Sequence, residues 1–223
     1  MIKIDLHIHS KYSEDASGSP EEIMKYVKKK GLHGMAITDH NSIKGGEKAK
    51  KLSNMNFIVI PGVEISTTQG HLIGLNVKKD IPKNRSVPET IEHIYDAGGI
   101  PIIPHLFRNM SGIKENNLKM VLNNISSIEV YNSCSLPKTN WNISAVAKKY
   151  NLGGTGGSDS HEPQYAGNAY TIIDTTDMNI DTIISEIEKK RTWGKGTTLP
   201  LSYRRDRMVK SLKQFFQRGL RRI

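Results

Sequence analysis

Cysteine is almost absent from this sequence, since Cys134 is the single one among 223 residues. An internal disulfide is therefore excluded, and one free thiol is typical of a reducing compartment. The sequence also lacks any run near the roughly 20 apolar residues that span a bilayer, and its first residues lack the charged-then-apolar layout of a signal peptide. We therefore expect a cytoplasmic protein without a transmembrane segment.

Acidic residues are scarce at one end of the chain. Residues 204–223 hold six arginines and two lysines against one aspartate, a local charge of +7 out of a net +10. The remaining chain is only mildly basic, which argues against a protein organised around a nucleic-acid-binding face. Near-helical spacing of apolar residues predicts an amphipathic helix in this tail. The stripe consists of Met208, Leu212, Phe215, Phe216 and Leu220.

Docking against the body of the protein is the commonest use of such a stripe. Peripheral attachment to a membrane surface and contact with nucleic acid are the alternatives.

What the sequence does contain is a regular alternation of short apolar runs and polar windows of helical pattern. An apolar content of 36% in 223 residues suits one unit with a full core. Repeated strand-helix units predict an α/β fold with parallel strands, and their number suggests closure into a barrel. The expected strands are residues 2–6, 35–38, 57–63, 72–77, 100–104, 127–131, 153–157 and 170–173. The expected helices are residues 20–30, 45–52, 87–97, 117–122, 143–150 and 180–190.

Histidine and carboxylate residues follow the expected strands. In such a barrel the active site is built from loops at the carboxyl ends of the strands, so side chains from distant segments would meet there. The His-x-His pair places two imidazoles on one face of an extended segment, where both can bind one ion. The residues at these strand ends are His7, His9, His40, Glu64, His105, Asn132, Asp159 and His161. The pattern predicts a metal site assembled by folding.

Five segments carry a resemblance to a known family. They are Asp5-Leu6-His7-Ile8-His9-Ser10, Ile37-Thr38-Asp39-His40-Asn41, Pro61-Gly62-Val63-Glu64, Ile103-Pro104-His105 and Gly157-Ser158-Asp159-Ser160-His161. In this order, across roughly residues 2–175, they resemble the motifs of the PHP (polymerase and histidinol phosphatase) family. The resemblance implies a distorted (β/α)₇ TIM-like barrel over residues 1–199, with a centre of two or three metals at the strand ends that hydrolyses phosphoesters. Residues 200–223 would then form the basic tail.

The resemblance also implies which residues hold the metals. His7, His9, Glu64 and Asp159 would bind one ion. Glu64, His71 and His105 would bind a second ion that shares the glutamate. Asp15, His40 and His161 would bind the third, with Glu14 as the alternative to Asp15.

The expected ligands define the expected chemistry. Mixed imidazole and carboxylate ligands suit Mn²⁺, Zn²⁺ or Fe²⁺. Three carboxylates neutralise only half the charge of three divalent ions, so the pocket would favour a phosphate dianion. A hydroxide bridging two metals would be the nucleophile. Asp39 could accept a hydrogen bond from a ligand imidazole, while Arg108 and Asn132 could contact the substrate.

The sequence thus predicts a metal-dependent phosphoesterase that acts on a small phosphorylated metabolite or nucleotide. One alternative is an exonuclease or oligonucleotide phosphoesterase, for which nucleic acid is the substrate. The other is a non-catalytic, metal-stabilised binding module.

Overall fold

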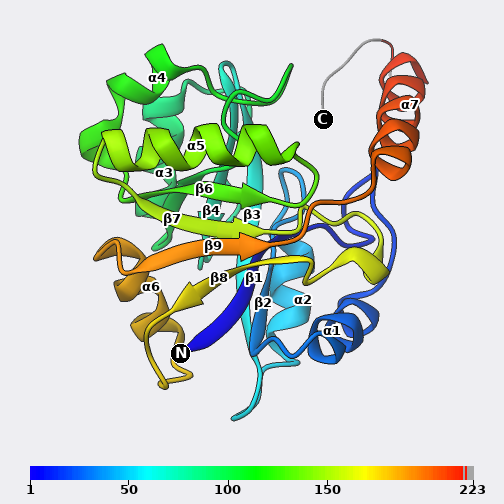
Figure 1. The fold of residues 1–223 in the computed structure, drawn as a ribbon, viewed down its shortest axis with the longest axis vertical. Coiled ribbons are helices and arrows are strands. Elements are labelled where there is room, and N and C mark those ends of the chain that lie inside the picture. The colour runs from blue at the N-terminus through cyan, green and yellow to red at the C-terminus, as the bar shows by residue number, and fades with distance from the viewer. Residues whose placement is uncertain (218, 220–223) are drawn as a thin grey trace.

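The strands of this protein form one sheet that curves into a nearly closed barrel (Figure 1). The structure is a computed structural model and describes residues 1–217 and 219. The sheet order is β7-β6-β5-β4-β3-β2-β1-β8-β9. The nine strands in this part of the chain are β1 (Ile2–Ile8), β2 (Gly34–Ile37), β3 (Ile58–Thr67), β4 (Gly70–Leu75), β5 (Ile100–Ile103), β6 (Ser127–Asn132), β7 (Gly153–Gly157), β8 (Ala169–Ile173) and β9 (Thr192–Gly196).

Strand direction follows the expected parallel pattern only in part. The pairs β1–β2, β2–β3, β5–β6 and β6–β7 are parallel. The pairs β3–β4, β4–β5, β1–β8 and β8–β9 are antiparallel. For β3 and β4 the difference arises because they form a tight hairpin around residues 68–69, with no room for the crossover helix that a parallel pair requires.

The two ends of the sheet are brought together by hydrogen bonds between β7 and the antiparallel pair β8–β9. The amide of Gly156 donates to Thr171 Oγ1 at 2.8 Å, and Thr192 Oγ1 donates to the carbonyl of Gly154 at 3.0 Å. A Cβ on Gly156 would lie 2.4 Å from the carbonyl oxygen of Tyr170, so glycine is required at this crossing. The glycine-rich run is therefore a close-packing strand.

Helices cover the outside of the barrel (Figure 1). Their starts follow local signals: Ser19 accepts a hydrogen bond from the Glu22 amide before Pro20, and Ser86 forms a capping box with Glu89. The helices before the tail are α1 (Pro20–Lys29), α2 (Lys44–Lys50), α3 (Val87–Asp96), α4 (Glu115–Met120), α5 (Pro137–Lys149) and α6 (Ile180–Glu188), with short turns η1 (Leu122–Asn124) and η2 (Pro163–Tyr165). Within the described part of the chain, no helix combines the length and the apolar character needed to cross a bilayer.

The tail forms helix α7 (Leu201–Gln217), which leads away from the barrel after its first turns (Figure 1). The expectation that the apolar stripe docks against the body is wrong for Leu212 and Phe216, which are 45% and 68% exposed. Contacts from the first two turns attach the helix to the barrel. Beyond these turns the helix axis diverges from the barrel (Figure 1). The side chains of Met208 and Phe215, and residue Leu220, lie outside the described residues.

Candidate metal centre

Backbone hydrogen bonds bring the histidine-rich segments together at one rim of the barrel. The amide of His9 donates to the carbonyl of Ser160 at 2.9 Å, and the amide of Asp159 donates to the carbonyl of His7 at 2.8 Å. The amide of Glu64 donates to the carbonyl of Asp39 at 3.1 Å. Segments far apart in sequence are thus fixed to one another by their main chains. Asp159 and His105 adopt positive backbone angles, φ 52° and φ 30°, which are uncommon for non-glycine residues.

Four side chains form the first ligand group. His7 Nε2 lies 3.2 Å from His9 Nε2, 3.4 Å from Glu64 Oε2 and 3.6 Å from Asp159 Oδ1. His9 Nε2 lies 3.2 Å from the same Glu64 oxygen and 3.4 Å from the same Asp159 oxygen. Ligands about 2.0–2.1 Å from a tetrahedral ion are roughly 3.3 Å apart, so these donor atoms already have the spacing of a four-coordinate site.

A second ligand group uses the other oxygen of Glu64. His71 Nδ1 lies 2.9 Å from Glu64 Oε1, and His105 Nε2 lies 2.8 Å from it. The β3–β4 hairpin places His71 opposite Ser66, beside the end of the glutamate's own strand. Because Oε2 faces the first group and Oε1 the second, one carboxylate could bridge two ions.

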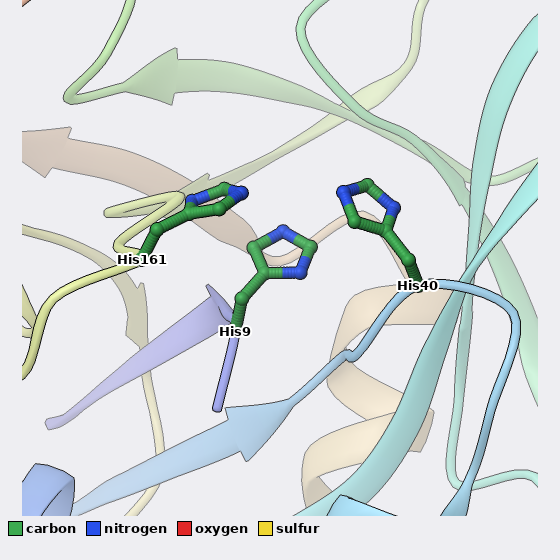
Figure 2. Close-up of side chains that lie close together, drawn as sticks. All are labelled: His9, His40 and His161. Carbon is green, nitrogen blue, oxygen red and sulfur yellow. The ribbon is translucent and has the colours of Figure 1, made fainter. Parts of the chain in front are cut away.

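The third group lies where His9, His40 and His161 converge (Figure 2). The ring centroids of His9 and His161 are 4.1 Å apart, and those of His9 and His40 are 4.4 Å apart. Asp15 joins them, with Oδ2 at 3.0 Å from His161 Nε2 and 3.8 Å from His40 Nε2. The structure brings Asp15 rather than its neighbour Glu14 to this group, because the side chain of Glu14 is exposed.

Buried polar atoms without protein partners show that this donor set suits cations. Within residues 1–217 and 219, Asp15 Oδ1 and His40 Nδ1 are buried and have no hydrogen-bond partner. Unpaired polar atoms are costly to bury, and an ion or its water would satisfy such atoms. The clustered donors therefore fit divalent metal ions.

Proton binding within the centre follows from burial and charge. Burial lowers the pKa of His105 and of His161 to about 4, which leaves both imidazoles neutral, the form that binds metals. Burial also acts to lower the pKa of His9, but Asp159 and Glu64 overcome it and raise that pKa to about 9. Burial acts to raise the pKa of Asp159, yet Arg108 and His7 bring it well below its usual range. In the absence of an ion, protons on histidine therefore balance the carboxylates.

Glu129 is part of the centre although the sequence did not indicate it. Its Oε1 lies 2.9 Å from His7 Nδ1, and its Oε2 accepts hydrogen bonds from the His105 amide at 2.9 Å and from Asn132 Nδ2 at 2.8 Å. Glu129 lies inside β6, three residues before the strand end at Asn132. A buried charge within an apolar strand was the available signal.

The expected contact between Asp39 and a ligand imidazole is not present. Asp39 instead accepts hydrogen bonds from the Ser10 amide at 2.6 Å, from Ser10 Oγ at 2.7 Å and from Ser13 Oγ at 2.9 Å. Ser13 Oγ lies 3.3 Å from His9 Nδ1, so Asp39 reaches the ligand through a serine. The loop after β1 places the Ser13 hydroxyl between the His9 imidazole and the Asp39 carboxylate.

Arg108 and Asn132 occupy different positions relative to the pocket. Arg108 Nη1 donates to Asp159 Oδ2 at 2.6 Å, and its side chain is 30% exposed beside the ligands. Asn132 is fully buried, and its amide is engaged with Glu129 and Arg108. The amide of Asn132 thus holds these two charged side chains, and its contact with substrate stays a prediction.

Comparisons with known proteins agree with this geometry. The chain is 34% identical over 186 residues to an uncharacterized protein of Methanocaldococcus jannaschii, covering 81% of this chain and 73% of that protein. It is 38% identical over 86 residues to a 5'-3' exoribonuclease of Haemophilus influenzae, covering 36% of this chain and 31% of that protein.

Among solved structures, the fold resembles a two-domain Bacteroides vulgatus protein containing a predicted PHP-like metal-dependent phosphoesterase. The TM-score is 0.73 at 16% identity, and the match covers 88% of this chain and 65% of that one. The model of the PHP domain family matches residues 5–186. With most of its length matched, and with the motif residues gathered at one rim of the barrel, this chain belongs to the PHP domain family.

Proposed function

We propose that this protein is a metal-dependent phosphoesterase that hydrolyses a small phosphorylated metabolite or nucleotide. The observation that carries the proposal is the first ligand group, in which donor atoms of His7 and His9 lie 3.2–3.6 Å from each other and from Glu64 and Asp159. The two further groups share Glu64 and His9 with it. Nine side chains would then hold two or three ions of Mn²⁺, Zn²⁺ or Fe²⁺.

The ions and the protein would have separate roles. Divalent ions would supply an activated water and would stabilise negative charge on the leaving oxygen. The chain's own residues orient the ligands: Glu129 fixes His7, and Ser13 fixes His9. Arg108, held by Asp159, lies where it can donate to a phosphate oxygen.

Charge supports a phosphate substrate. Asp15, Glu64, Asp159 and Glu129 carry four negative charges, against six positive charges on three divalent ions. Arg108 adds a further positive charge beside Asp159. A loaded centre would therefore be net positive and would attract a phosphate dianion.

An exonuclease or oligonucleotide phosphoesterase is the second candidate. The similarity to the Haemophilus influenzae exoribonuclease favours it, although the match spans only 31% of that protein. A non-catalytic binding module is a weaker alternative, because the nine side chains proposed as ligands lie close together, which supports an intact metal centre.

A substrate panel tests these candidates. Protein loaded with Mn²⁺ is assayed with p-nitrophenyl phosphate, AMP, histidinol phosphate and a short oligonucleotide. Turnover of a phosphomonoester, lost on chelation, is expected. Cleavage of the oligonucleotide alone would select the nuclease, and failure with every substrate at full metal occupancy would contradict hydrolysis and favour the binding module.

A further inference from the structure

The C-terminal helix brings a side chain to the metal centre that no motif indicated. The ring of Tyr203 packs against that of Tyr165, with centroids 4.1 Å apart, and Arg204 Nη1 donates to the carbonyl of Ser135 at 2.7 Å. These contacts fix the first turn of α7 beside the loops that follow β6 and β7. One turn later, Arg207 points back to the rim of the barrel.

Arg207 lies directly beside a residue of the third ligand group. Its Nη2 is 3.8 Å from Asp15 Oδ2, which in turn contacts His161. On the other side of His161, its Nδ1 lies 3.7 Å from Asp159 Oδ1. Asp159 in turn forms an ion pair with Arg108. The two guanidiniums therefore flank His161, each next to a carboxylate of the centre.

Both arginines are open toward solvent as well as toward the centre. The side chains of Arg108 and Arg207 are 30% and 24% exposed. A cation next to metal ligands weakens the attraction for metal ions but strengthens the attraction for an anion.

We propose that Arg207 is a substrate-binding residue that, opposite Arg108, holds the phosphate group of the substrate over the metal centre. This inference rests on the proposed function and extends it to a residue outside the family match at 5–186. The separation of 3.8 Å between Arg207 and Asp15 is longer than a hydrogen bond, so the planar guanidinium can turn to a phosphate oxygen without losing one.

The helix itself does not depend on Arg207. Tyr203 and Arg204 already attach its first turn, so removal of the Arg207 guanidinium should leave α7 in place. Arg205 offers a matched control, because it lies on the same helix, is 72% exposed and pairs with its neighbour Asp206. Its removal changes the net charge equally without touching the centre.

The test measures inorganic phosphate binding to full-length, Mn²⁺-loaded protein by calorimetry. We expect Arg207→Ala to weaken phosphate binding by about tenfold or more, since hydrogen bonds to charged groups contribute strongly. Arg207→Lys should recover part of the loss, and Arg205→Ala should bind as the wild type does. The metal content should be the same in all four proteins, and the KM for a hydrolysed phosphomonoester should rise in parallel.

Two results for Arg207→Ala would overturn the inference. One is equal phosphate affinity in wild type and Arg207→Ala, and the other is a loss of metal in Arg207→Ala that accounts for the whole effect. The failure of the proposed function is a separate result: wild-type protein that binds phosphate through Arg207 but hydrolyses no ester would retain the inference and refute hydrolysis. Absence of phosphate binding to the metal-loaded wild type would overturn the inference itself.

Discussion

His7 and Glu129 form a buried pair in which the Nδ1 of the imidazole lies 2.9 Å from a carboxylate oxygen. This contact turns the opposite nitrogen, Nε2, toward His9, Glu64 and Asp159. The second oxygen of Glu129 accepts from the amide of His105, so one carboxylate positions ligands of two groups. Such partners of metal-binding histidines fix the tautomer and raise the basicity of the ligand.

Replacing Glu129 should therefore weaken metal binding without unfolding the barrel. We expect Glu129→Gln to lower Mn²⁺ affinity by about 10–100-fold, the usual effect of losing such a partner. Titration calorimetry on the metal-free protein measures it. Glu115→Gln, which alters a carboxylate bonded to Lys149 and Tyr150, is the control and should bind as the wild type does. Equal affinities in both variants would show that Glu129 does not support His7.

Gly157 is predicted to be intolerant of even a methyl group. A Cβ at this position would lie 2.2 Å from His7 Cβ and 2.8 Å from Glu129 Oε1. Gly157→Ala should therefore displace the His7–Glu129 pair and lower both metal content and activity by about tenfold or more, as the partner loss does. Gly31→Ala is the comparison, because nothing lies within 4 Å of its Cβ and only backbone strain of about 1 kcal/mol arises at φ +72°. Full metal content in purified Gly157→Ala would disprove the proposed packing.

Metal removal should lower thermal stability, because the buried carboxylates and imidazoles lose the ions that bind only the folded state. At an ion concentration about 100 times the Kd, each site contributes about 2.7 kcal/mol. For a chain of this size that corresponds to a Tm higher by roughly 5–10 °C per site. Calorimetric scans with and without Mn²⁺ measure the change. A Tm that does not respond to Mn²⁺ would argue against ion binding at this centre.

His40→Ala and Asp159→Ala should abolish hydrolysis but leave a folded barrel, because strand-end ligands serve the chemistry more than the core. The backbone amide of His40 remains able to donate to Ser13 Oγ after the substitution. His93→Ala on α3 provides a control histidine outside the three groups. Circular dichroism and initial rates are compared for all variants. Retained activity in purified Asp159→Ala would count against the assignment of the ligands.

Much of the fold could be predicted from sequence because the apolar runs and cap residues act locally. Ser19 and Pro20, for example, mark the start of α1 in the sequence and cap it in the structure. The strand β9 was missed, since Thr192-Trp193-Gly194-Lys195-Gly196 has two glycines and little apolar alternation. Its role depends on close approach to β7, where Gly194 lies against Thr155 and Gly156, and such contacts exist only after the sheet curves.

Most candidate ligands could be found in sequence because they follow an expected strand, and Asp15 and His71 were indicated by the family resemblance. Glu129 could not be found by that rule, because it lies in the middle of the expected strand 127–131. Its side chain meets His7 only once the barrel has folded. Arg207 could not be found either, because the tail was expected to dock through its apolar stripe, and the position of Arg207 at the rim depends on where α7 begins. Asn132 followed the rule but is buried, because a strand end can also point into the packing.

The most direct test of the central claim is metal analysis combined with anomalous diffraction on protein prepared with Mn²⁺ and without chelator. The structure leads us to expect two or three ions per chain, one of them bonded to His7, His9, Glu64 and Asp159, and loss of at least that ion in Asp159→Ala. Less than one ion per chain at saturating Mn²⁺, or anomalous peaks away from these four side chains, would contradict the account.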